Sequence, residues 1–152
     1  PDHVQLISNG HYQDCLVSSR SAREYGTSTN ADYEYPGSLD LAGGELHRDA
    51  VLQELDTGLY INNLWYLNYS DRNSCQLTGM TRFACFWVEH GEIQAPLNVM
   101  RFDDSIYNLF GSNLLGLTCE RQLILDASTY GRRSNRSMEL PGVLVKDLRL
   151  TL

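Results

Sequence analysis

The 152-residue sequence contains no long apolar run and no segment that resembles a secretory leader. A membrane-spanning helix needs about 20 consecutive apolar residues, and no stretch of the chain approaches this length. A leader begins with basic residues and continues into an apolar core, and the first residues show no such order. We therefore expect a cytoplasmic protein with no membrane partner.

Basic clusters are almost missing. The formal net charge is -7 at pH 7, and the one basic cluster combines Arg132 and Arg133 with Arg136. A protein that binds duplex nucleic acid presents a basic face to the phosphates. The charge of this chain therefore argues against nucleic acid as a partner.

The cysteines lack the Cys-x-x-Cys spacing that is typical of zinc and redox sites. The four cysteines are Cys15, Cys75, Cys85 and Cys119. Cys85 falls in a strongly apolar stretch, where a thiol usually serves as a small hydrophobic group. We expect reduced thiols, with a disulfide between two of the cysteines as the alternative.

The histidines are isolated as well. No two of them lie at helical spacing from each other, and the four are His3, His11, His47 and His90. Glu45 and His47 are two positions apart, so their side chains point in different directions on a helix. The sequence therefore predicts no metal ligand and no cofactor-binding residue in this chain.

Motifs for a nucleophile or for phosphate binding are missing too. No serine lies in a Gly-x-Ser-x-Gly elbow. Cys119 lies next to Glu120 but has no histidine nearby in sequence, which favours a structural cysteine over a reactive thiol. The segment Ala42-Gly43-Gly44 is interpreted as a flexible connection that leads into a helix. We predict no catalytic residue.

The most informative stretch that is present runs from Thr78 to Ile93. Residues 80–88 are apolar on both alternating faces, which predicts a central strand buried on two sides. Gly91 suits a tight turn within residues 89–92 because glycine tolerates a positive φ. Residues 93–99 then predict a returning strand, and Pro96 marks it as an edge strand or a bulged one.

Turn and cap residues place the remaining elements. Asn9-Gly10 predicts a hairpin, Ser21 and Glu24 have capping-box spacing before Gly26, and Asp103 is the expected cap of another helix. Further strands are predicted over residues 4–7, 12–18, 37–41, 59–67, 117–126 and 143–152. A helix is predicted over residues 45–56, and loops over 68–76 and 131–141. Together these elements predict one strand-rich α+β domain over residues 1–152, with antiparallel sheets arranged as a sandwich or barrel and about three short helices.

Several blocks of the chain, in the same order, resemble the C-terminal part of the TldD/PmbA family. The blocks are residues 10–16 with 18–23, residues 52–61, Thr78 to Ile93, and residues 142–148. Members of this family are called peptide-maturation metalloproteases or modulators of DNA gyrase. They are two to three times longer than this chain, so the resemblance implies the C-terminal domain of a longer protein.

The chain departs from the family pattern where the family binds metal. Catalytic members carry a His-Glu-x-x-x-His helix, and this sequence has no such motif. They also carry a metal-binding cysteine in the loop before the final strand, whereas residues 131–137 here contain none. The family's Gly-Asn-Asp after the last helix is replaced around Gly116 to Glu120. The resemblance is therefore to the PmbA/TldE-like branch, the companion subunit without metal ligands.

This resemblance implies a role in peptide processing or proteolysis. The partner would be a paralogous TldD-like subunit that holds zinc, or a second copy in a homodimer, and the substrate would be a peptide. This domain would contribute dimer surface and part of a substrate chamber, and whether the chain belongs to an active enzyme stays open. The alternative is a non-enzymatic protein-interaction module that stabilises its partner.

Aromatic residues at alternating strand positions allow two interpretations. The residues concerned are Tyr60, Trp65, Tyr66, Phe83 and Trp87. They either pack in a core or form a surface for a peptide or a partner subunit. For the surface interpretation, the candidate contact residues are Arg20, Arg23, Arg82 and Trp87.

Overall fold

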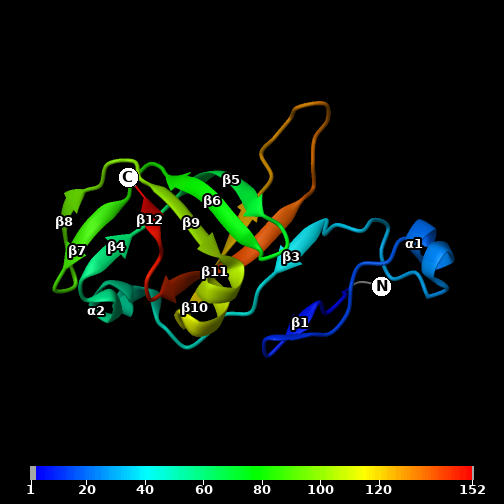
Figure 1. The fold of residues 1–152 in the computed structure, drawn as a ribbon, viewed down its shortest axis with the longest axis horizontal. Helices are drawn as coiled ribbons and strands as arrows, with labels where there is room; N and C mark the ends of the chain where they lie inside the picture. The colour runs from blue at the N-terminus through cyan, green and yellow to red at the C-terminus, as the bar shows by residue number, and fades with distance from the viewer. Residues whose placement is uncertain (1–2, 152) are drawn as a thin grey trace. The chain divides into compact units, whose positions relative to one another are not determined.

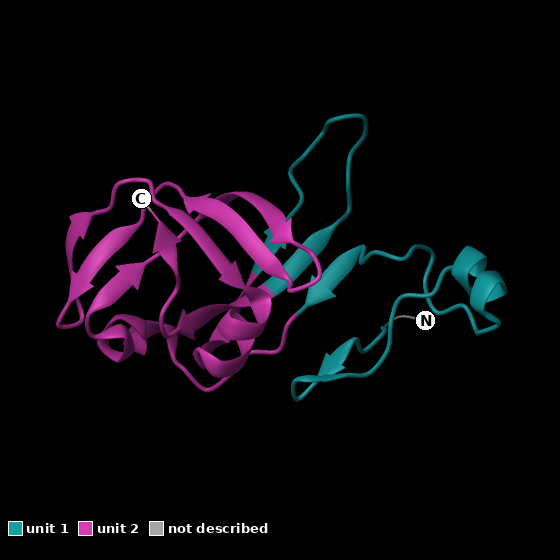
Figure 2. Cartoon of the chain, viewed as in Figure 1, with its two compact units in different colours: residues 1–40, 123–139 teal, residues 41–122, 140–152 magenta. Residues whose placement is uncertain are grey.

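The computed structural model describes residues 3–151 (Figure 1) and divides into two compact units (Figure 2). Unit 1 comprises residues 1–40 and 123–139, and unit 2 comprises residues 41–122 and 140–152. Both units are strand-rich, and the sheets formed by the described residues are open, with none closed into a barrel. The predicted α+β class with antiparallel sheets and about three short helices is confirmed.

Unit 1 begins with the hairpin predicted from Asn9-Gly10. Strands β1 (Ile7–Ser8) and β2 (His11–Tyr12) pair antiparallel. Asn9 and Gly10 have φ values of 50° and 75°, the positive pair that a two-residue type I′ turn requires. Both strands are only two residues long, so the predicted strand over residues 12–18 is wrong.

Ser18, the last residue of the predicted strand 12–18, is the N-cap of a helix. Helix α1 (Ser19–Tyr25) begins after Ser18, whose hydroxyl accepts hydrogen bonds from the backbone N–H groups of Arg20 and Ser21. The cap therefore lies three residues before the predicted Ser21. Gly26 ends the helix in the left-handed conformation with a φ of 66°, as the sequence predicts.

A three-stranded sheet has the order β10-β11-β3. Strand β3 (Ser38–Asp40) lies within the predicted residues 37–41 and pairs parallel with β11 (Ser137–Val145). Strand β10 (Leu114–Leu125) is the longest strand. Strand β11 begins inside the predicted loop 131–141, so that loop is shorter than expected.

Unit 2 contains two sheets of its own (Figure 1). One has the order β12-β9-β6-β5 and the other β4-β7-β8. The strands of the first are β5 (Leu64–Asp71), β6 (Gln76–Thr81), β9 (Arg101–Ser105) and β12 (Leu150–Thr151). Those of the second are β4 (Gly58–Tyr60), β7 (Phe86–Glu89) and β8 (Glu92–Pro96).

The predicted central strand over residues 80–88 is wrong. Residues 80 and 81 end β6, and residues 86–89 form β7 in the other sheet. Phe83 and Ala84 have positive φ values of 53° and 36°, and Phe83 is 66% exposed. The apolar alternation thus belongs to two strands in different sheets, because the chain turns sharply between them.

The β7–β8 hairpin is confirmed. His90 and Gly91 have positive φ values of 52° and 75°, and β8 lies at the edge of its sheet, with Pro96 as its last residue. An edge position tolerates a residue without a backbone N–H.

Two further predicted strands are each divided between two sheets. The segment 59–67 contributes to β4 and then to β5, and β5 continues through residues 68–71 of the predicted loop 68–76. The segment 143–152 contributes the end of β11 and then β12, while Leu152 lies outside the described residues. Side chains alternate between the two faces with a period of two in every strand. This alternation therefore cannot show where the chain leaves one sheet and enters another.

The helices of unit 2 are shorter than predicted. The helix expected over residues 45–56 consists of the 3₁₀ turn η1 (Arg48–Ala50) and helix α2 (Val51–Leu55), and Asp56 is the C-cap of α2, close to the expected end. Asp103 does not cap a helix, because β9 pairs with β6 through Ser105 and draws Asp103 into the sheet. The π-helical turn η2 (Asn108–Ser112) follows. None of the helices within residues 3–151 has the length and apolar character to span a lipid bilayer.

The interior of unit 2 is small and includes polar groups. Val88 and Phe102 are 0% and 1% exposed, and Thr81 is 1% exposed. Thr81 bonds to the backbone of Met100 through its hydroxyl and its N–H, which satisfies the polar atoms that burial would otherwise destabilise.

Asp104, on β9, is a buried carboxylate that is hydrogen-bonded to residues before β12 and in η2. It is 2% exposed and accepts hydrogen bonds from the N–H groups of Arg149 and Ser105 and from the Asn108 amide. Burial raises the pKa of Asp104, but these donors and the Arg149 charge outweigh burial and hold the pKa below its ordinary value of 3.8.

We predict that Asp104→Asn lowers the free energy of unfolding by about 1–3 kcal/mol, because the amide turns a donor toward N–H groups that need an acceptor. The carboxylate's contribution to the free energy of unfolding is complete above the pKa that Asp104 has in the unfolded chain. This contribution is lost as the pH falls through the lower pKa that Asp104 has in the folded protein. Denaturant unfolding of both proteins should therefore show stabilities that converge as the pH falls from about 5 to about 2. Glu92→Gln on the exposed strand β8 is the control. A difference that stays constant down to the lowest pH would contradict this role.

Candidate functional site

Residues 43–46 of unit 2 lie directly against strand β10. The Gly44 N–H donates to the Thr118 carbonyl at 3.0 Å, and the Leu46 N–H donates to the Leu117 carbonyl at 3.1 Å. The Cys119 N–H donates to the Leu46 carbonyl at 2.8 Å, and Leu46 and Thr118 form a parallel bridge. These bonds form a short backbone ladder, which we call the 44–119 ladder.

The two glycines at the start of this segment are required by the close approach. A Cβ added to Gly43 would lie 2.8 Å from the carbonyl oxygens of Thr118 and Cys119, and one added to Gly44 would lie 2.6 Å from the Leu117 oxygen. Real Cβ atoms do not approach backbone oxygens so closely, so glycine is needed here for space. The interpretation of residues 42–44 as a flexible connection is therefore replaced by a packing role.

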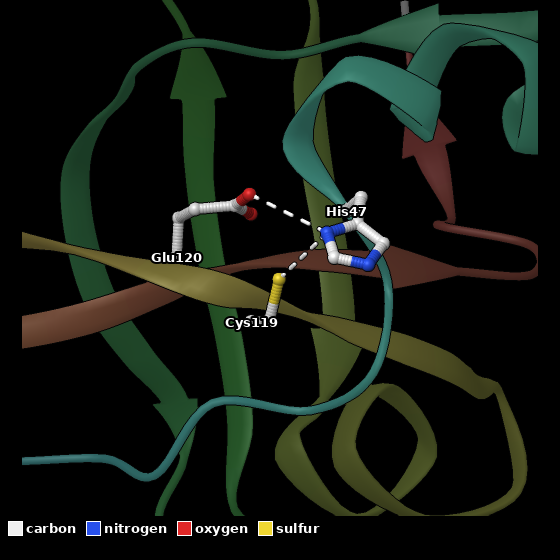
Figure 3. A group of neighbouring side chains, drawn as sticks. All are labelled: His47, Cys119 and Glu120. Carbon is white, nitrogen blue, oxygen red and sulfur yellow. Dashed lines mark hydrogen bonds and ion pairs between the residues drawn. The ribbon is translucent and has the colours of Figure 1, made fainter.

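Three metal-ligating side chains meet at the end of the 44–119 ladder (Figure 3). His47 follows Leu46, and Cys119 and Glu120 follow Thr118. The His47 Nδ1 atom lies 3.3 Å from the Cys119 Sγ atom and 3.7 Å from Glu120 Oε1. One donor atom from each residue lies within 4.8 Å of the other two.

The surrounding backbone orients Glu120. The Arg48 N–H donates to Glu120 Oε2 at 2.9 Å, which leaves Oε1 toward the imidazole. The Thr118 hydroxyl donates to the Glu120 carbonyl at 2.7 Å and accepts the Gly142 N–H at 2.7 Å. Thr118 is only 5% exposed, whereas the neighbouring His47, Cys119 and Glu120 side chains are exposed to solvent.

The thiol and the carboxylate shift each other's pKa in opposite directions. A hydrogen bond from the Cys119 thiol, followed by the one from the Arg48 N–H, lowers the pKa of Glu120 to about 2. The same hydrogen bond with Glu120 raises the pKa of the Cys119 thiol. In the absence of a cation the thiol therefore stays protonated and the carboxylate charged at neutral pH.

This arrangement does not fit a nucleophilic relay. A Cys–His–acid triad uses one imidazole nitrogen to accept the thiol proton and the other to contact the acid. Here the same atom, His47 Nδ1, faces both the thiol and the carboxylate. The raised pKa of Cys119 also opposes thiolate formation. The cluster instead places three possible metal-ligand atoms close together: a nitrogen of His47, the sulfur of Cys119 and an oxygen of Glu120.

Sequence reasoning missed this group because its members are distant along the chain. Cys119 has no histidine near it in sequence, but the 44–119 ladder brings His47 beside it across a separation of 72 residues. The paired glycines at positions 43 and 44 were the one signal in the sequence for a close backbone approach. They do not indicate which strand is approached. Cys119 is exposed, and the structure holds all four cysteines free of disulfides.

The predicted contact residues Arg20 and Arg23 lie together in unit 1. Both come from α1 and line a hollow of about 380 Å³ with Ser19 and Glu24. Arg20 also pairs with Glu34 at 3.7 Å, with both side chains well exposed. Solvent screens such an exposed ion pair, so the pair contributes little to stability. Arg20 could therefore exchange Glu34 for another acidic group at little cost.

Arg82 and Trp87 belong to unit 2. The Arg82 guanidinium lies 5.0 Å from the Trp65 ring centre and 4.8 Å from that of Phe83, within the range of cation–π attraction. Arg82 also lines a hollow of about 260 Å³ formed by residues 81–86 and 96–99. Trp87, on β7, is 36% exposed and is not among the residues that line this hollow.

Strand β5 is an exposed edge strand with large apolar side chains. It is the last strand of its sheet, and all eight of its residues are exposed. The apolar members are 37–74% exposed; they are Leu64, Trp65, Tyr66, Leu67 and Tyr69. An edge strand of this kind presents unpaired backbone groups and apolar side chains together, which favours pairing with another chain.

Comparisons with known proteins agree on one family. The family model described as "PmbA/TldA metallopeptidase C-terminal domain" matches residues 2–152. The Metalloprotease PmbA of Escherichia coli O157:H7 is 24% identical over 145 residues, which covers 95% of this chain and 29% of that protein. The chain thus spans less than a third of this relative's length.

Two solved structures share the fold. TldE from Thermococcus kodakarensis aligns with a TM-score of 0.75 and 16% identity over 97% of this chain and 33% of its own. A Thermotoga maritima protein described as a modulator of a DNA gyrase aligns with a TM-score of 0.75 and 19% identity, over 96% of this chain and 32% of its own.

We predict that Gly44→Ala lowers the free energy of unfolding by about 1–3 kcal/mol, because the added methyl group displaces residues 44–46 from β10. Denaturant unfolding measures the change. Gly37→Ala is the matched control, since a Cβ at Gly37 meets no atom within 4 Å. Equal stability of the two variants would show that the glycine is not needed for the close approach.

Proposed function

Because the chain belongs to the PmbA/TldA metallopeptidase family as its C-terminal domain, we propose that it acts as part of a companion subunit in peptide processing. In this proposal residues 1–152 form one C-terminal domain of a longer cytoplasmic protein. The domain provides surface for a dimer and part of a chamber for the peptide substrate. Zinc-dependent proteolysis takes place in a paralogous TldD-like partner subunit or, in a homodimer, depends on parts of the chain outside these residues.

The observation that carries this proposal is the absence of donors where the resemblance implies a metal-binding cysteine. Residues 131–137 consist of Gly, Arg, Ser and Asn, and contain no His, Cys or carboxylate. This loop therefore does not fit the family's metal, and no step of peptide hydrolysis is assigned to it. The name Metalloprotease PmbA describes a whole relative, of which this chain matches 29%.

The exposed strand β5 supports the subunit role. A partner strand added to this edge would satisfy its free backbone groups and bury its apolar side chains. Arg82 extends this surface, because its guanidinium packs on the Trp65 ring. We propose Arg82 and Trp87 in unit 2, and Arg20 and Arg23 in unit 1, as further contact residues for the partner or the peptide.

We predict that peptide hydrolysis requires both subunits. The longer protein that contains this chain, its TldD-like partner and their mixture would each be incubated with an unfolded peptide, and cleavage followed by mass spectrometry. Cleavage by the mixture alone, abolished by a chelator, is the expected result. Cleavage by the longer protein alone in monomeric form would overturn the companion role. A stable complex without cleavage would favour the alternative, a non-enzymatic interaction module.

Within the same complex, Leu67→Glu should raise the dissociation constant by about tenfold or more, because a buried charge on the edge strand opposes strand pairing. Ile93→Glu is the matched control: Ile93 is also an exposed apolar residue, on the edge strand β8. Isothermal titration calorimetry measures both. Equal effects of the two variants would remove β5 from the proposed interface.

A further inference from the structure

Three side chains of different donor chemistry converge in unit 2, and we propose that His47, Cys119 and Glu120 form a zinc-binding site. A tetrahedral zinc ion has bonds of about 2.0–2.3 Å, so its ligand atoms are about 3.3–3.8 Å apart. The Nδ1–Sγ and Nδ1–Oε1 distances of 3.3 and 3.7 Å match two of these edges. The third pair of donors, one from Cys119 and one from Glu120, lies within 4.8 Å, and a bound ion would draw the two atoms closer together.

The donor set favours zinc over the common hard cations. Magnesium and calcium prefer a shell of oxygen ligands, whereas zinc accepts thiolate sulfur, imidazole nitrogen and carboxylate oxygen together. Binding breaks the Cys119 S–H bond, forms a zinc–sulfur bond and releases one proton to solvent. No oxidant or reductant is involved.

The backbone prepares this geometry before a metal arrives. The 44–119 ladder fixes the segment that carries His47 against the strand that carries Cys119 and Glu120. The Arg48 N–H holds one oxygen of Glu120 and leaves the other toward the imidazole. Such support around the ligands raises affinity, because less order has to be imposed on binding.

Three protein ligands leave one position of a tetrahedral ion for water or for an added ligand. The side chains of His47 and Glu120 are 76% and 47% exposed, so an ion enters and leaves directly from solvent. We therefore expect an exchangeable site that binds more weakly than a closed site with four protein ligands.

Cobalt(II) is the probe that tests the site. The purified 152-residue chain, kept reduced, would be titrated with Co²⁺ while its absorption is recorded. We expect one equivalent of Co²⁺ to produce the near-ultraviolet band of thiolate-to-cobalt charge transfer and the visible bands of a tetrahedral ion. Added Zn²⁺ should remove these bands by displacement.

Variants of the proposed ligands test which residues give rise to the cobalt absorption bands. Cys119→Ser should abolish the charge-transfer band, and His47→Ala should lower the affinity by about 100-fold or more, since even supporting residues around a metal contribute 10- to 100-fold. Cys15→Ser and His90→Ala, which change an exposed cysteine and an exposed histidine elsewhere, are the matched controls and should behave like the wild type. Circular dichroism would verify that each variant is folded.

A charge-transfer band that persists in Cys119→Ser, or that never appears in the folded wild type, would overturn the proposal. Either result would leave the proposed subunit role intact, because that role is measured by complex formation and cleavage. Conversely, a chain that binds zinc here but fails to join a partner would overturn the subunit role alone.

Discussion

The contact on which the group of His47, Cys119 and Glu120 depends is the close approach of residues 43–46 to strand β10. Two glycines allow this approach, because any Cβ at Gly43 or Gly44 would collide with carbonyl oxygens of the strand. The ladder that follows brings a histidine from one segment beside a cysteine and a glutamate from another. The buried Thr118 accepts a hydrogen bond from Gly142 of β11. The exposed donor group therefore lies next to a buried, hydrogen-bonded residue of β10.

The fold class and the local turns could be predicted from the sequence because their causes are local. Asn9-Gly10, Gly26 and His90-Gly91 each adopt the positive φ values that their turn or cap requires. The assignment of strands to sheets could not be predicted in this way. The alternation of residues 80–88 is real, but Phe83 and Ala84 turn the chain from one sheet into another. Asp103 has a good capping side chain, yet pairing of β9 with β6 outweighs that preference.

The candidate site shows the same limit. Cys119 and Glu120 are adjacent, but no local pattern connects them to His47, and only the ladder does so. The family, in contrast, could be identified from ordered sequence blocks, and the match over residues 2–152 confirms it. Family membership, the donor-free loop at residues 131–137 and the exposed edge strand β5 together support the proposal that the chain is part of a subunit that binds a partner. A zinc site beside β10 would be an additional property of this subunit.

The most direct test of the ladder and of the site it builds is anomalous X-ray scattering at the zinc absorption edge, from crystals of the zinc-loaded chain. Our account predicts one strong peak about 2.0–2.3 Å from His47 Nδ1, Cys119 Sγ and a carboxylate oxygen of Glu120. It also predicts that Gly44 remains hydrogen-bonded to Thr118 in those crystals. No peak between these three residues, or a zinc ion held by other side chains, would contradict it.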